Sequence, residues 1–97
     1  MPAMHYRIRW PDLNESLCYS PSLVIQDYFT PGAEYTVPDF LRRIREATQI
    51  ASERVRVKFG MPCSRALAQL QTIELAAAGF ADRADARIVM MSFHEGG

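Results

Sequence analysis

Residues 36–60 read TVPDFLRRIREATQIASERVRVKFG and predict the longest helix of the chain. Thr36 and Asp39 have the spacing of a capping box, and Gly60 is the kind of residue that commonly follows a helix end. Arg42 and Glu46 are four residues apart on the polar face and should form an ion pair. The apolar side chains recur at spacings of three and four, which is typical of an amphipathic helix: Phe40, Ile44, Ala47, Ala51, Val55 and Phe59.

A second helix follows with no linker between the two. We expect it to begin at Pro62 and to run to about Gly79, because proline is favoured in the first turn of a helix. Its predicted buried stripe consists of Leu67, Leu70, Ile73, Ala77 and Phe80. The core between the two helices should contain Phe40, Ile44, Leu67 and Leu70.

A β-hairpin precedes these helices. Residues 4–10 alternate between apolar and polar side chains, which indicates a half-buried strand, and residues 15–19 are predicted to return beside it. With residues 11–14 as the loop, Ile8 faces Leu17, Tyr6 faces Tyr19, and Arg7 lies beside Cys18 on the other face. A register slip of one residue would exchange the two faces.

The remaining segments complete the predicted fold. Ser20 and Pro21 favour a short helix over residues 21–27 with Ser20 as its N-cap, and residues 33–37 should be extended before Pro38. Residues 87–94 predict a last strand, and its nearly continuous apolar run suggests partial cover on both faces. The order predicts an α+β fold, in which two main helices and one short helix pack on one face of a small antiparallel sheet. This sheet would consist of the N-terminal hairpin plus the C-terminal strand.

Length and composition fit one globular domain over residues 1–97. The chain is 48% hydrophobic and 23% charged, which are ordinary values for a folded protein. Eleven basic and eleven acidic residues cancel, so the overall charge does not favour nucleic acid or an anionic membrane as a partner. No apolar run approaches the roughly 20 residues that span a bilayer, and two cysteines are too few for a secreted disulfide scaffold. We therefore expect a cytoplasmic protein.

The segment 59–65 contains the strongest candidate site. Cys63 stands at or just inside a predicted helix N-terminus, where unpaired N–H groups and the helix dipole favour a thiolate. Ser64 and Arg65 add hydrogen-bond donors, and together with Arg7 they make this a candidate anion site. In the structural alternative, Cys63 is simply a small buried residue at the start of the apolar stripe.

Cys18 is the second candidate for thiol chemistry. It could pair with Cys63 only if their Cα atoms lie within about 7 Å, and the sequence lacks a C-x-x-C motif. His5 and His94 fall in the first and last predicted strands, which could be neighbours. Because these histidines and cysteines lack the short spacings of zinc modules, we predict no metal site.

The chain ends in Glu95-Gly96-Gly97, which resembles the tail of ubiquitin-like sulfur carriers. Those domains have one principal helix, whereas this sequence predicts two in succession. The sequence also lacks a phosphate-binding glycine loop and a Ser-His-Asp arrangement, so no cofactor is predicted and an autonomous hydrolase or dehydrogenase is disfavoured.

Four segments together resemble one known family: R-W-P-D (9–12), C-Y-S-P-S-L-V (18–24), A-S-E-R-V-R-x-K-F-G (51–60) and P-C-S-R-A-L-x-Q-L (62–70). They are similar to small bacterial nitrogen-starvation-response proteins encoded beside a nitrilase homologue, a radical-SAM protein and a flavoprotein. That gene neighbourhood is associated with nitrile or cyanide assimilation. Leu13 departs from the turn glycine expected after Pro-Asp. The resemblance implies a biological context and no catalytic residues.

These observations predict an accessory or regulatory binding protein of a nitrogen-starvation or nitrile-assimilation system, not an enzyme by itself. It would bind a protein partner or a small metabolite, as a homodimer or in a complex with neighbouring gene products. The alternative is a thiol-dependent enzyme or carrier that uses Cys63, with Arg65 as anion holder and Cys18 as resolving thiol. Nucleic acid and membrane are not expected partners.

Overall fold

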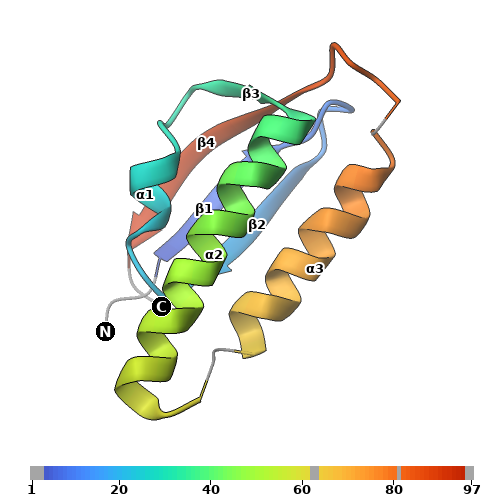
Figure 1. The fold of residues 1–97 in the computed structure, drawn as a ribbon. Helices are drawn as coiled ribbons and strands as arrows, with labels where there is room; N and C mark the ends of the chain where they lie inside the picture. Colours follow the sequence, from blue (N-terminus) through green and yellow to red (C-terminus); the bar gives the residue numbers. More distant parts are fainter. Residues whose placement is uncertain (1–3, 62–63, 81, 96–97) are drawn as a thin grey trace.

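The computed structural model describes residues 4–61, 64–80 and 82–95, and its strands form one antiparallel sheet (Figure 1). The strand order across the sheet is β2-β1-β4-β3. Helices α2 and α3 lie side by side across one face, and α1 lies beside α2. The elements in chain order are β1 (Met4–Arg9), β2 (Glu15–Ser20), α1 (Ile25–Tyr28), β3 (Glu34–Thr36), α2 (Val37–Phe59), α3 (Ser64–Ala78) and β4 (Arg87–Glu95). The predicted α+β class is confirmed.

The sheet contains one strand more than the sequence predicted. The residues of β3 were expected to be extended, but they also pair with β4, with Tyr35 opposite Ile88. The extended segment ends one residue earlier than predicted, because Thr36 is already the N-cap of α2 and Val37 begins the helix. Pro38 then lies in the first turn, where its missing N–H leaves no intrahelical hydrogen bond unmade.

The hairpin register is shifted by one residue from the predicted one. Tyr6 lies opposite Cys18 and Arg7 opposite Leu17, so Cys18 faces the helices and Arg7 does not lie beside it. The reason is a loop of three residues rather than four, closed by the Trp10 N–H donating to the Asn14 carbonyl at 2.7 Å. Leu13 ends this loop with φ 73°, in the left-handed region that such loops require.

A bulge in β4 explains its nearly continuous apolar run. Ser92 pairs with Arg7 and Met90 with Ile8, so Met91 is an extra residue with no partner in β1. The extra residue changes which positions face the helices, so that Met90 is buried and Phe93 also packs against the core. Within the described residues the helices cover one face of the sheet (Figure 1), and Val89 and Met91 of β4 are half-buried.

The short helix begins later than predicted. Helix α1 starts at Ile25, and its N-cap residue Val24 makes no side-chain capping hydrogen bond. Ser20 is the last residue of β2 rather than an N-cap, because it pairs with Met4 in the sheet. Its hydroxyl donates instead to the Ser22 carbonyl at 2.9 Å, which stabilises a local turn.

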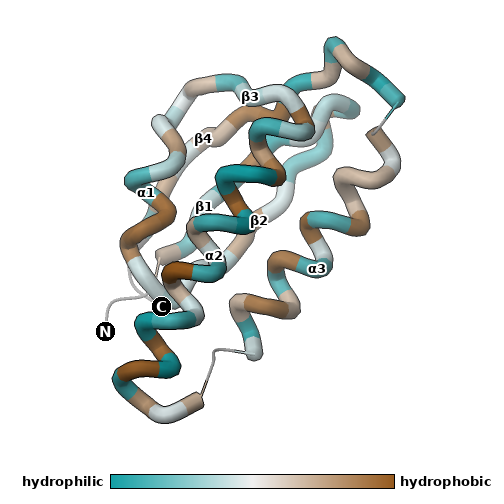
Figure 2. The backbone as a smooth tube through the Cα atoms, viewed as in Figure 1, coloured by the Kyte–Doolittle hydropathy of each residue, from teal (hydrophilic) through white to brown (hydrophobic). Residues whose placement is uncertain are grey.

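Helix α2 has the predicted ends. The Asp39 N–H donates to Thr36 Oγ1 at 3.2 Å, and Gly60, with φ 81°, donates its N–H to the Arg56 carbonyl. The apolar stripe is buried from Phe40 to Ala51, but Phe59 is 64% exposed. A helix of 23 residues is about 34 Å long, whereas a six-residue strand is about 20 Å long. The C-terminal part of α2 therefore extends past the sheet, and Figure 2 shows hydrophobic segments in this projecting end.

Helix α3 is rotated relative to the predicted stripe. Leu67 is 44% exposed, while Ala66, Ile73 and Ala77 are buried, and Leu70 packs partly against the core. The prediction that Leu67 belongs to the inter-helix core was wrong, because the small side chain of Ala66 occupies the position facing the neighbouring elements. The predicted start at Pro62 lies outside the described residues. The largest fully buried side chains of the fold are Tyr6, Phe40, Met4, Ile8, Ile25, Ile44, Ile73, Ile88, Met90 and Cys18.

Candidate functional site

The residues predicted to form the thiol and anion site fall in different surroundings. Cys63 lies outside the described residues, and Ser64 is the exposed first residue of α3. Arg65 stacks over the ring of Tyr19, with its guanidinium carbon 3.9 Å from the ring centroid. Arg7 lies on the open face of the sheet, where its Nη1 is 3.5 Å from a Glu15 carboxylate oxygen. Arg7 and Arg65 therefore have separate partners, and a shared anion site with Cys63 stays a prediction.

Cys18 is a core residue in the structure. It is a free cysteine, only 2% exposed, and directly opposite Tyr6 in the sheet. Burial raises the pKa of the Cys18 thiol to about 12, although a hydrogen bond with Tyr6 works in the opposite direction. Burial likewise holds the pKa of Tyr6 well above its ordinary value. Because the thiolate is the nucleophile, Cys18 is poorly suited to thiol chemistry in the folded protein.

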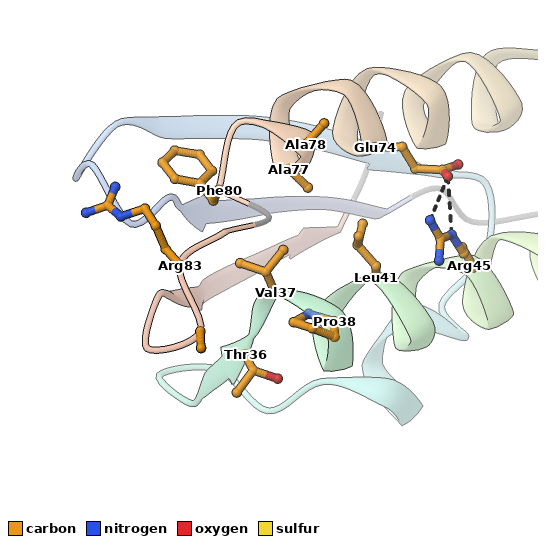
Figure 3. A pocket seen from close by; sticks show the side chains of 11 residues that line it. Thr36, Val37, Pro38, Leu41, Arg45, Glu74, Ala77, Ala78, Phe80 and Arg83 are labelled. Carbon is orange, nitrogen blue, oxygen red and sulfur yellow. Dashed lines mark hydrogen bonds and ion pairs between the residues drawn. The ribbon is translucent and has the colours of Figure 1, made fainter.

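A cavity of about 660 Å³ lies where the start of α2, the end of α3 and the following loop meet (Figure 3). Its volume lies within the range of small-molecule sites. Sequence reasoning missed it, because its lining comes from segments that are far apart along the chain. The lining residues are Thr36, Val37, Pro38, Leu41, Arg45, Glu74, Ala77, Ala78, Phe80, Arg83 and Ala84.

The walls of the cavity are held by ordinary packing. Phe80 stacks on Trp10 with ring centroids 6.0 Å apart and planes inclined by 15°. The Phe80 N–H donates to the Ala77 carbonyl at 2.9 Å, which fixes the ring just past the end of α3. On the opposite wall, the capped first turn of α2 places Pro38 and Leu41 against the cavity.

The charges around the cavity are unevenly distributed. Arg45 donates from Nε and Nη2 to Glu74 Oε2 at 3.2 and 2.9 Å, which links α2 to α3 at one end (Figure 3). Arg83, with its guanidinium carbon 5.8 Å from the Phe80 ring centroid, makes no ion pair within the described part of the chain. Two guanidinium groups and one carboxylate leave the lining with one net positive charge.

The lining offers binding groups rather than a catalytic arrangement. None of the residues that form the cavity is a cysteine, histidine, lysine or tyrosine, and the Thr36 hydroxyl already accepts a hydrogen bond from Asp39. The polar side chains of the lining are Thr36, whose hydroxyl can still donate its proton, the Arg45–Glu74 pair, and Arg83, whose guanidinium is directed away from Pro38 and Leu41 in Figure 3. Such a mixture of apolar walls and a few oriented polar groups is typical of a small-molecule site.

The two histidines lie side by side, as the sequence analysis suggested they could. His5 and His94 are directly opposite each other in the β1–β4 pair. Together with Arg7 and Leu17 they line a shallow hollow of about 310 Å³ on the open face of the sheet. Across residues 4–61, 64–80 and 82–95, no group of three or more histidine, cysteine, aspartate or glutamate residues could hold a metal ion.

The fold and the cavity define a small α+β protein in which two long helices cover one face of a four-stranded antiparallel sheet and border an open, mostly apolar pocket. Residues 5–93 match the family of the nitrogen starvation-induced protein NitG, so the chain belongs to that family. This agrees with the nitrogen-starvation resemblance found in its sequence segments. The chain matches no curated protein and no solved structure. Among the helices of the described residues, none is both long enough and apolar enough to cross a membrane.

Proposed function

We propose that the protein is a cytoplasmic accessory protein of the nitrogen-starvation response that binds a small, largely apolar anion in the pocket between α2 and α3. The observation that carries the proposal is the cavity of about 660 Å³ with apolar walls and one net positive charge. The protein binds its ligand without transforming it. The resemblance implies genes for a nitrilase homologue and a radical-SAM protein as neighbours, and we propose that the protein acts together with their products.

The proposed binding mode follows from the two ends of the pocket. The apolar body of the ligand packs between Leu41 and Phe80, where burial of its surface supplies most of the affinity. Its negative group binds Arg83, whose flexible side chain turns toward the pocket from the direction drawn in Figure 3 and whose planar guanidinium can donate two parallel hydrogen bonds to a carboxylate. The Arg45–Glu74 pair closes the other end without adding net charge. A monoanion is therefore preferred over a neutral ligand of the same shape.

The charge preference is tested with benzoate and its neutral analogue benzamide as probes, by calorimetry or by titration of amide NMR signals. Arg83→Gln should weaken benzoate binding at least tenfold and leave benzamide binding nearly unchanged. Arg56→Gln is the matched control, because Arg56 pairs with Glu53 near the far end of α2, away from the cavity. Equal binding of both probes to the unchanged protein would contradict the charge preference.

The location of the site is tested by filling the cavity. Ala78 lines it while being exposed, so Ala78→Leu should block both probes without disturbing the core. Ala76→Leu, at an exposed position of α3 outside the lining, should bind both probes normally. The proposal fails if benzoate binds the Ala78→Leu and Ala76→Leu proteins equally well, or if it binds neither the unchanged protein nor any variant.

A further inference from the structure

The face of the sheet opposite the helices is open in the described residues (Figure 1). It carries a cluster of cationic and titratable side chains. His5 and Arg7 are two residues apart in β1 and therefore point to the same face. His94 lies directly opposite His5, and Ser92 directly opposite Arg7, in the neighbouring strand β4. His5, Arg7 and His94, with Leu17, line the hollow of about 310 Å³. The sheet register thus brings three nitrogen-bearing side chains into one concave surface.

The hydrogen-bonding groups of this hollow are held in place by their neighbours. His94 Nε2 is 2.9 Å from Ser92 Oγ, and the His5 and Tyr19 rings form a T-shaped pair with centroids 5.7 Å apart. Arg7 and Arg9 both approach Glu15, at 3.5 and 3.4 Å. Because two guanidinium groups share one carboxylate, one positive charge remains uncompensated even when both histidines are neutral.

Protonation of the histidines would increase this charge excess. Histidine is the side chain whose charge changes near neutral pH. Like charges directly opposite each other in a sheet repel, and an anion bound between them offsets this repulsion. The charged and titratable groups nearest the pair are Arg7 and Arg9 of β1, Glu15 and Tyr19 of β2, and Arg65 of α3, which stacks on Tyr19. Ser92 of β4 adds a hydroxyl beside His94.

We propose that this hollow is a binding site for a small oxyanion with two negative charges, such as a sulfate or a phosphate group, and that binding is coupled to proton uptake. Arg7 supplies the permanent charge, and His5 and His94 donate N–H groups to the anion from two adjacent strands. Because ligand binding and protonation are thermodynamically linked, the anion makes protonation of the histidines easier, and protonation in turn tightens anion binding. This site is separate from the pocket between α2 and α3, and it does not depend on that pocket being occupied.

Sulfate is the best first probe, because its charge is constant over the pH range in which histidine titrates. The chain contains only two histidines, so the ring C–H signals of both can be followed individually by NMR. Sulfate should shift both sets of signals at pH 5.5 and should bind at least tenfold more weakly at pH 8. At saturating sulfate, the titration midpoints of both histidines should move to higher pH. Inorganic phosphate then tests whether a phosphate group is accepted at the same site.

Three substitutions test the geometry of the site. Arg7→Gln should weaken sulfate binding at pH 5.5 at least fivefold, and His94→Asn should remove most of the pH dependence. Arg87→Gln is the matched control, because Arg87 is an exposed arginine of β4 at the far end of the strand from His94 and changes the net charge equally. The amide spectrum of each variant shows whether it is folded. The proposal is overturned if sulfate leaves the histidine signals unchanged, if its affinity is equal at both pH values, or if Arg87→Gln weakens binding as much as Arg7→Gln.

Discussion

Leu13 adopts a backbone conformation that glycine accommodates more easily. Its φ of 73° lies in the left-handed region, and it is the one non-glycine residue with a positive φ among those described. Its side chain is 75% exposed, so little packing compensates for the strain. For an L-residue this conformation costs about 1–2 kcal/mol, whereas glycine adopts it freely and loses only some chain entropy on folding. The three-residue loop, not the side chain, determines the conformation of this residue.

Leu13→Gly should therefore raise the free energy of unfolding by about 1 kcal/mol, as measured by urea denaturation. Leu13→Ala is the matched control, because alanine removes the same exposed side chain but retains the unfavourable conformation. It should leave the stability nearly unchanged. If the free energy of unfolding rose equally in the alanine and glycine variants, the gain would come from removing the exposed leucine side chain rather than from the backbone conformation.

At the scale of single elements, the rotation of α3 shows that residue size helps to determine which face of a helix is buried. The spacing of Leu67, Leu70 and Ile73 indicates a stripe centred on the leucines, but the small Ala66 and Ala77 are the buried neighbours of Ile73. Alanine lets a helix approach a partner closely, so a face with alanines can be buried more completely than one with leucines. Apolar periodicity therefore indicated the presence of this helix correctly but its rotation only in part.

The rotation of α3 predicts unequal effects for two similar substitutions. Ile73→Ala should reduce the free energy of unfolding by roughly 2–5 kcal/mol, because Ile73 is 2% exposed and its removal leaves a cavity. Leu67→Ala removes a side chain that is 44% exposed and should cost less than about 1 kcal/mol. Urea melts of the two variants give both values. If Leu67→Ala reduced the free energy of unfolding more than Ile73→Ala does, α3 would present the opposite face to the core.

At the scale of the whole molecule, the projecting end of α2 makes the protein elongated, with extents of 40 × 22 × 18 Å. Three large apolar side chains near this end are mostly exposed: Val57 at 73%, Phe59 at 64% and Met61 at 71%. Large apolar groups gathered at one surface commonly mark a contact with another protein. The contact with another protein is therefore expected at this end of the molecule.

We predict that the protein forms a homodimer or a complex with a neighbouring gene product through this end. Light scattering of the purified chain should give a dimer mass, or affinity capture should recover the complex. Phe59→Asp should abolish the association, whereas Leu75→Asp, at a residue of α3 that is 71% exposed, should not. A chain that remains monomeric at high concentration and captures none of the neighbouring gene products would contradict the prediction.

The sequence by itself determined the features that depend on neighbouring residues. The N-cap of α2 at Thr36 and its end at Gly60 follow from hydrogen bonds that span three or four positions. The two long helices, the hairpin and the last strand follow from apolar periodicity, and together they were sufficient to predict the α+β class. The nitrogen-starvation family was also recognisable from the segments of sequence alone. The caps and the individual helices and strands can each be read within a short window of the chain, and the fold class and the family follow from their order and from four such segments taken together.

The tertiary structure alone decided the features that depend on contacts between distant segments. The hairpin register depended on one loop residue, and this one-residue shift placed Cys18 in the core, whereas Arg7 lies on the face that the alternation of β1 predicted. The cavity depends on Arg45 meeting Glu74 across 29 positions, and the oxyanion hollow on His5 meeting His94 across the whole chain. No local propensity distinguishes such partners from other arrangements with the same elements. Their positions follow from the packing of α2 and α3 on the sheet and from the bulge at Met91, which sets the register between β1 and β4.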